Sequence, residues 1–96
     1  MKKYPKTLTV TELKSELFKN KKFVTEYESQ SSEFQIAKQL ITARLKRNLT
    51  QAELAKKINT GQAVISRLEG LSSKASISLL ERLAKALNIQ FQLTIG

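Results

Sequence analysis

The residues of this chain that could do a defined kind of chemistry lie close together in one short window. The window holds Gln62, Ala63, Ser66 and Arg67. At helical spacing these four share one face, whereas Ile65 and Leu68 fall on the opposite, apolar face. A helix that aligns polar and small side chains in this way can present them to base edges in the DNA major groove. The window therefore predicts a surface that contacts nucleic acid.

A second helix, directly before this window, is predicted to hold it in position. Thr50 and Glu53 have the spacing of a capping box, in which each side chain accepts a hydrogen bond from the backbone N–H of the other residue. Ala55 is small where the two helices must cross, and Asn59 tolerates the positive φ that the turn requires. The inward positions are apolar, at Leu54, Ile58, Ile65 and Leu68. Residues 49–69 therefore predict two short helices joined by a tight turn.

A polar break at Ser29-Gln30-Ser31-Ser32 divides the chain into two predicted parts. Residues 1–32 would form an N-terminal appendage that binds a partner, and residues 33–96 would form the main domain. The main domain would open with a helix that is capped by Ser31 or Ser32. Asn48 would end that helix, because asparagine tolerates left-handed backbone geometry.

The last part of the chain changes from a helical to a strand-like period. The last helix carries apolar residues from Ile77 to Leu87 at helical spacing and should be capped by Ser76 or by the pair Ser78 and Glu81. Beyond it, apolar and polar residues alternate from Ile89 to Ile95, which predicts a half-buried strand. A lone strand leaves backbone groups unpaired. Three partners stay open: residues 7–10, which alternate weakly, the same strand of a second subunit, or another protein.

Composition narrows the function classes. The chain of 96 residues has no Cys and no His, which removes disulfides, the usual zinc ligands and His-based acid–base catalysis. No nucleophile–base pair stands out, so we expect no enzyme, no cofactor and no metal site. The formal net charge of +9 favours a polyanionic partner. No apolar run approaches the about 18 residues of a membrane helix, and no signal-peptide core follows the basic start. We therefore expect a cytoplasmic protein with no membrane partner.

From Phe34 to Ile89 the sequence resembles the Cro/repressor-type helix-turn-helix family, also called XRE-like. The motifs are Leu49-Thr50-Gln51-Ala52-Glu53-Leu54-Ala55, Ile65-Ser66-Arg67-Leu68-Glu69 and the closing helix from Leu80 to Leu87. Asn59 and Leu71 stand where Gly is usual or frequent, and Gly61 stands where Ser or Thr usually caps the second helix. The resemblance implies a mainly α fold: a five-helix-type helix-turn-helix domain with an N-terminal helical appendage and a short C-terminal β-strand.

The resemblance also implies how DNA would be read. Gln62 would be the leading base-reading residue, since a carboxamide can form two hydrogen bonds with adenine N6 and N7. Ala63 would contact a thymine methyl, Ser66 would assist, and Arg67 would bind either guanine or a phosphate. Such proteins bind as homodimers to inverted repeats with half-sites about 34 Å apart. We expect the dimer to be built from the last helix and the strand over residues 89–95.

Other positions take supporting roles in the family. Gln51, at the start of the first motif helix, would contact the DNA backbone, as would Thr60 and Lys74. Arg44 and Glu69 resemble a partly buried ion pair that the family often uses. That pair would explain a charge on an otherwise apolar helix face.

The residues before Phe34 resemble the front end of HigA-type antitoxins, through Glu16-Leu17-Phe18, Val24, Glu26-Tyr27-Glu28 and Glu33-Phe34. An antitoxin dimer of that family represses its own operon and neutralises a RelE/HigB-like mRNA endonuclease toxin. The resemblance therefore implies a small basic toxin as partner, docked on an apolar stripe that begins in a helix capped by Thr11. The stripe is Leu13, Leu17, Phe18, Phe23 and Tyr27. The alternative for its aromatic residues is a satellite core.

Two other functions stay open. A stand-alone, phage-like transcriptional repressor would use the appendage for dimerisation and would have no toxin partner. An adaptor protein would use the fold for protein contacts alone and would retain no specific DNA.

Overall fold

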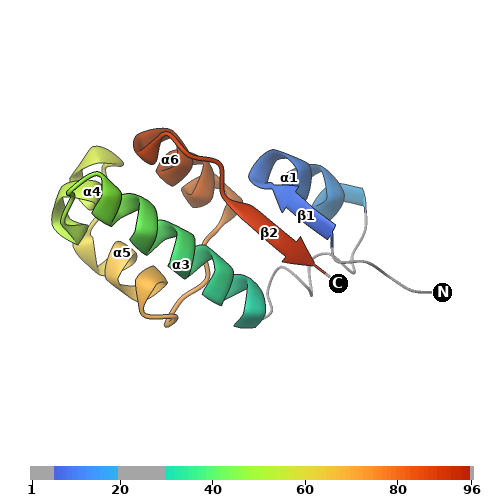
Figure 1. Cartoon of the computed structure of the whole chain (residues 1–96), viewed down its shortest axis with the longest axis horizontal. Helices are drawn as coiled ribbons and strands as arrows, with labels where there is room; N and C mark the ends of the chain where they lie inside the picture. Colours follow the sequence, from blue (N-terminus) through green and yellow to red (C-terminus); the bar gives the residue numbers. More distant parts are fainter. Residues whose placement is uncertain (1–5, 20–29, 96) are drawn as a thin grey trace.

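The computed structural model describes residues 6–19 and 30–95, and within them the chain is mainly helical (Figure 1). The elements are β1 (Lys6–Thr9), α1 (Val10–Lys19), α3 (Gln30–Lys46), α4 (Gln51–Lys57), α5 (Gln62–Glu69), α6 (Ile77–Leu87) and β2 (Gln92–Ile95). In Figure 1, α3 runs along the molecule, with α4 and α5 at one end and with β1, β2 and α1 toward the other. The predicted fold class is confirmed: five helices in the described ranges, and a short C-terminal strand.

One hydrophobic core joins the helical pair to the two strands. Leu54 of α4 and Ile65 of α5 are fully buried, as the inward positions predicted. Leu8 of β1 and Phe91, just before β2, lie in the same core. Burial of such side chains supplies most of the stabilisation of a small domain. The strand-like N-terminal residues therefore contribute to the same core as the helix-turn-helix.

The C-terminal strand pairs with the N-terminal one. β1 and β2 are antiparallel, with Leu8 opposite Leu93 and Thr7 opposite Thr94. Both leucines are buried, whereas the threonine hydroxyls meet on the exposed face with their oxygens 3.2 Å apart. Of the three partners that the sequence left open, the structure therefore selects the strand of the same chain.

The other edge of β2 is occupied by two glutamine side chains of α3. Gln39 donates from Nε2 to the carbonyl oxygen of Gln92 at 2.7 Å and accepts from its N–H at 2.8 Å. Gln35 does the same to Thr94, at 3.0 Å and 2.7 Å. Alternate residues of an antiparallel strand aim their backbone groups at opposite edges. Both edges of β2 are thus bonded within one chain, which argues against the predicted use of this strand as a dimer edge.

Two predicted helix starts are wrong. α1 begins at Val10, directly after β1, and Thr9 rather than Thr11 caps it. The N–H of Glu12 donates to Thr9 Oγ1 at 3.3 Å, and the N–H of Thr9 donates to Glu12 Oε1 at 3.2 Å. This capping box replaces any linker between strand and helix. α3 begins at Gln30, ahead of the Ser31 or Ser32 cap, so Gln30, Ser31 and the boundary at residue 32 fall within a helix.

The last turns of α3, α4, α5 and α6 are each followed by a residue with positive φ. Asn48, Asn59 and Asn88 have φ angles of 54°, 57° and 54°, and Leu71 has a φ of 61°. Asparagine is one of the few residues that visit this region readily, and the sequence predicted it at Asn48 and Asn59. Leu71 adopts the same geometry where the family frequently has glycine. α6 begins at Ser76, one of its two predicted caps, whose Oγ accepts from the N–H of Leu79 at 3.1 Å.

Candidate nucleic-acid interface

The outer face of α5 carries the residues expected to read DNA. Its exposed members are Gln62, Ala63, Ser66 and Arg67. On the opposite side, Ile65 and Leu68 are buried against the core. Gly61 is the N-cap of α5 and provides no side-chain hydrogen bond, and a Cβ at Gly61 would meet nothing within 4 Å. The first turn of α5 therefore lacks a side-chain cap, while the buried face of the helix packs on the core.

The helix before it, α4, has the predicted capping box. Glu53 N–H donates to Thr50 Oγ1 at 3.0 Å, and Thr50 N–H donates to Glu53 Oε1 at 2.9 Å. The backbone hydrogen bond from Thr50, followed by the one from its side chain, lowers the pKa of Glu53 below its usual value. Because the pKa of Glu53 is lower in the folded than in the unfolded protein, its carboxylate stabilises the fold at a pH above the unfolded-state pKa. This stabilisation is lost as the pH falls through the pKa of the folded state.

The turn between α4 and α5 is closed by backbone hydrogen bonds. Asn59 takes the left-handed conformation, and the N–H of Thr60 donates to the carbonyl oxygen of Ala55 at 2.9 Å. Ala55 is buried, as expected for a small residue where two helices meet closely. Arg82 of α6 adds a bond that the sequence analysis missed, since its Nη2 donates to the carbonyl oxygen of Ile58. A cation at the C-terminal end of a helix is also favoured by the helix dipole.

An ion pair fixes α5 to α3 behind this surface. Arg44 Nε donates to Glu69 Oε2 at 2.7 Å, and Arg44 Nη2 donates to Glu69 Oε1 at 3.0 Å. The two side chains are only 12% and 6% exposed. Arg44 Nη1 also donates to the carbonyl oxygen of Leu49 at 2.7 Å. The hydrogen bond with Glu69 raises the pKa of Arg44, against the opposing effect of burial. The predicted pair is therefore present, and it joins α3, α5 and the start of α4.

The remaining predicted DNA contacts are Gln51, Thr60 and Lys74, which belong to three different segments of the motif. Gln51 begins α4, but its Nε2 donates to Glu69 Oε1 at 3.0 Å, so its carboxamide is already engaged. Thr60 is half-buried in the turn, and Lys74 is exposed in the loop after α5. Along the chain they lie at the start of α4, in the turn between α4 and α5, and in the loop after α5.

The predicted toxin contacts are only partly within the described residues. Leu13, Leu17 and Phe18 belong to α1, whereas Phe23 and Tyr27 lie outside the described ranges. An exposed ion pair joins Lys14 of α1 to Glu81 of α6 at 3.5 Å.

Membrane-spanning helices and metal-binding clusters are both absent from the described part of the chain. Every helix in residues 6–19 and 30–95 is too short or too polar to cross a membrane. The same residues contain no cluster of three or more metal-ligating side chains that could hold a metal ion.

Comparison with known proteins agrees with this geometry. A family model described as helix-turn-helix matches residues 40–93, which is more than half of the chain and includes α4, the turn and α5. No curated protein and no solved structure matches the chain.

Proposed function

Because this chain belongs to the Cro/repressor-type (XRE-like) helix-turn-helix family, we propose that it binds one operator sequence through α5 and represses transcription there. The observation that carries the proposal is the outer face of α5. Its polar and small side chains are exposed, while its apolar face and the ion pair between Arg44 and Glu69 fix the helix to the core. Such a rigid, polar helix is what the major groove accommodates. The proposal includes a cytoplasmic location, because the operator would lie there.

The proposed roles at the bases follow from side-chain chemistry. Gln62, in the first turn of α5, is the proposed reader of adenine, since recognition helices contact bases with their N-terminal residues. Ala63 would pack on a thymine methyl and Ser66 would add one hydrogen bond. Arg67, in the last turn, would bind guanine or a phosphate.

The proposed phosphate contacts are Gln51, Thr60 and Lys74. Since the carboxamide of Gln51 is bonded to Glu69, its contact would use the backbone N–H at the start of α4. The net charge of +9 supports binding to a polyanion. Affinity should fall with rising salt, because each neutralised phosphate releases counterions.

A homodimer on an inverted repeat is part of the proposal. One helix reads few base pairs, and two-fold related helices would meet half-sites about 34 Å apart. Both backbone edges of β2 are bonded within the chain. The proposed dimer contact is therefore α6 rather than strand pairing.

Alanine substitution at Gln62 or Arg67 tests the DNA proposal. Each change should weaken operator binding by about 1–3 kcal/mol if the residue reads a base, and should relax preference at one position of the site. Fluorescence anisotropy on the selected operator and on single-base variants measures both effects. The matched control is Lys46→Ala, an exposed cation on α3 that lies outside the proposed DNA and dimer contacts. Equal losses for Arg67→Ala on every DNA sequence would make Arg67 a phosphate contact, and no loss for either variant would contradict the assignment of α5.

We further propose that the protein is an antitoxin that neutralises a small basic endonuclease of the RelE/HigB-like class. The support is the resemblance of the residues before Phe34 to HigA-type antitoxins, combined with a DNA-binding domain. The proposed docking residues are Leu13, Leu17, Phe18, Phe23 and Tyr27. The division into a partner-binding part, residues 1–32, and a DNA-binding part, residues 33–96, stays a prediction.

Co-expression tests the antitoxin proposal. The chain should co-purify with a small basic protein encoded beside it and should restore growth that this protein arrests. Deletion of residues 1–32 is a poor test, because it removes Leu8 and Val10 from the core. Phe23→Ala and Tyr27→Ala are the sharper variants, and both should retain operator binding while losing the toxin. Operator binding without rescue would favour the stand-alone repressor, and salt-insensitive protein binding without DNA retention would favour an adaptor.

A further inference from the structure

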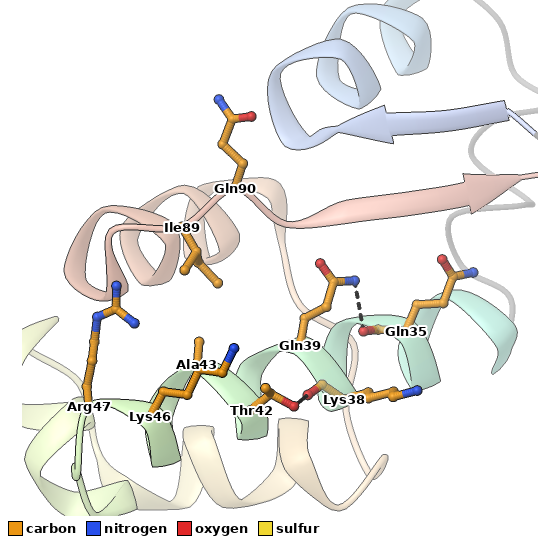
Figure 2. A pocket seen from close by; sticks show the side chains of 9 residues that line it. All are labelled: Gln35, Lys38, Gln39, Thr42, Ala43, Lys46, Arg47, Ile89 and Gln90. Carbon is orange, nitrogen blue, oxygen red and sulfur yellow. Dashed lines mark hydrogen bonds between the residues drawn. The ribbon is translucent and has the colours of Figure 1, made fainter.

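The solvent-facing side of α3 carries two neighbouring hollows of different chemistry. The first is an open groove of about 650 Å³ between α3 and residues 89–90, and Figure 2 shows the side chains that line it. The second, of about 370 Å³, lies on the α5 side of α3. Lys38 and Thr42 line both hollows, so they form a ridge between them. We call this surface the α3 face.

The first groove is basic. Lys38, Lys46 and Arg47 line it, and none of its lining residues in the described part of the chain is a carboxylate. All three cations are exposed, and none forms an ion pair within the described residues. The carboxamides of Gln35 and Gln39, which also line the groove, are engaged by β2. The groove therefore offers positive charge that no anion of the described chain balances.

The second hollow is apolar. Its lining includes Phe34, Ile41 and Leu71, and Glu69, the one carboxylate among the described residues that line it, is held by Arg44. Phe34 is 59% exposed, and Leu45, one helical turn beyond Ile41, is 58% exposed. Phe34, Ile41 and Leu45 follow a helical spacing along one stripe of α3. An apolar stripe therefore runs beside the basic groove on the same helix.

We propose that the α3 face binds an acidic amphipathic helix of a protein partner. The apolar side of such a helix would cover Phe34, Ile41 and Leu45, and glutamate or aspartate residues on its flank would meet Lys38, Lys46 and Arg47. This is the helix-in-groove mode of peptide recognition, with charge complementarity added. A phosphate backbone would satisfy the cations but would leave the apolar stripe in water. A second copy of the chain would bring like charges together, since a two-fold interface apposes identical patches.

The α3 face is separate from the residues that are proposed to contact DNA. None of the proposed DNA-contact residues lines either hollow. An occupied α3 face would leave the outer surface of α5 uncovered. The protein could therefore hold this partner and DNA at the same time.

A designed peptide tests the proposal on the full chain. The probe is a fluorescein-labelled peptide of about 18 residues, long enough to form a helix in water, with leucines on one face and glutamates on the flanks. A second peptide has glutamine in place of every glutamate. The glutamate peptide should bind about tenfold more tightly than the glutamine peptide, measured by fluorescence anisotropy at physiological salt.

Charge-matched variants distinguish the effect of the basic groove on peptide binding from the effect of the protein's net charge. K46E/R47E should weaken binding of the glutamate peptide about tenfold, whereas K56E/K57E, the same charge change on α4, should weaken it about twofold or less. Circular dichroism confirms that both variants are folded. Equal losses for the two variants, or no binding of the peptide, would overturn the proposal.

Two further measurements distinguish the other occupants. F34A/L45A should also weaken peptide binding and should leave the oligomeric state unchanged in light scattering. Dissociation of a dimer by this change would overturn the proposal in favour of a self-interface. If K46E/R47E reduces binding of a single-stranded oligonucleotide more than binding of the peptide, the surface serves nucleic acid and the proposal is wrong.

Discussion

Replacing Glu69 with alanine is expected to lower the free energy of unfolding by about 3–5 kcal/mol. The substitution leaves the guanidinium of Arg44, which is only 12% exposed, without its carboxylate. It also removes the acceptor of Gln51 Nε2. An uncompensated charge in a mostly buried site is costly, because the lost water is not replaced by another partner. The loss would weaken the connection between α3, α5 and the start of α4.

Urea unfolding followed by circular dichroism measures this effect. The matched control is Glu81→Ala, which breaks the exposed pair with Lys14 and should cost about 1 kcal/mol or less. Replacing both partners, as Arg44→Met with Glu69→Leu, should recover much of the loss, since an apolar pair of similar volume needs no counter-charge. A Glu69→Ala protein that is as stable as the Glu81→Ala protein would contradict the structural role of the pair.

Replacing Leu8 with alanine is expected to destabilise the fold by about 2–5 kcal/mol. Leu8 is 2% exposed and lies opposite Leu93 in the two-stranded sheet. Removing its branched side chain would open a cavity in the core that also holds α5 and α6. The N-terminal strand is therefore expected to stabilise the DNA-binding part of the chain directly.

Thr7→Ala is the matched control for this second prediction. Thr7 is exposed on the same strand, and its hydroxyl meets that of Thr94, so its loss should cost about 0.5 kcal/mol. Both variants are compared by urea unfolding and by operator binding at a temperature where each is folded. If Leu8→Ala is no less stable than Thr7→Ala, β1 lies outside the cooperative core.

Local sequence rules predicted much of the helical pair. The capping box of Thr50 and Glu53 needs residues only three positions apart, and Asn59 marks the turn through its own backbone tolerance. The ion pair of Arg44 and Glu69 followed from the family resemblance, and it explains a charge on the buried side of α3. These features were predictable because each depends on a motif of short range or on one recognised position.

The N-terminal half of the fold was harder to predict because its determinants are distant in the chain. The pairing of Leu8 with Leu93 spans nearly the whole sequence, and alternation alone gives no partner. Thr9 and Glu12 form a capping box that the weak strand signal over residues 7–10 obscured. Gln35 and Gln39, spaced by one helical turn, gave no signal of their own, since exposed glutamines on a helix are ordinary. Their role follows only from the position of β2.

The glutamine side chains on β2 also bear on solubility. An unprotected strand edge is a template for the addition of further chains, and repeated addition leads to aggregates. A carboxamide offers the same donor and acceptor as a peptide group, so Gln35 and Gln39 supply what a third strand would otherwise supply. α3, which carries both glutamines, thereby protects the outer edge of β2. Mutation of these glutamines is therefore expected to lower the solubility of the protein before it weakens the affinity for DNA.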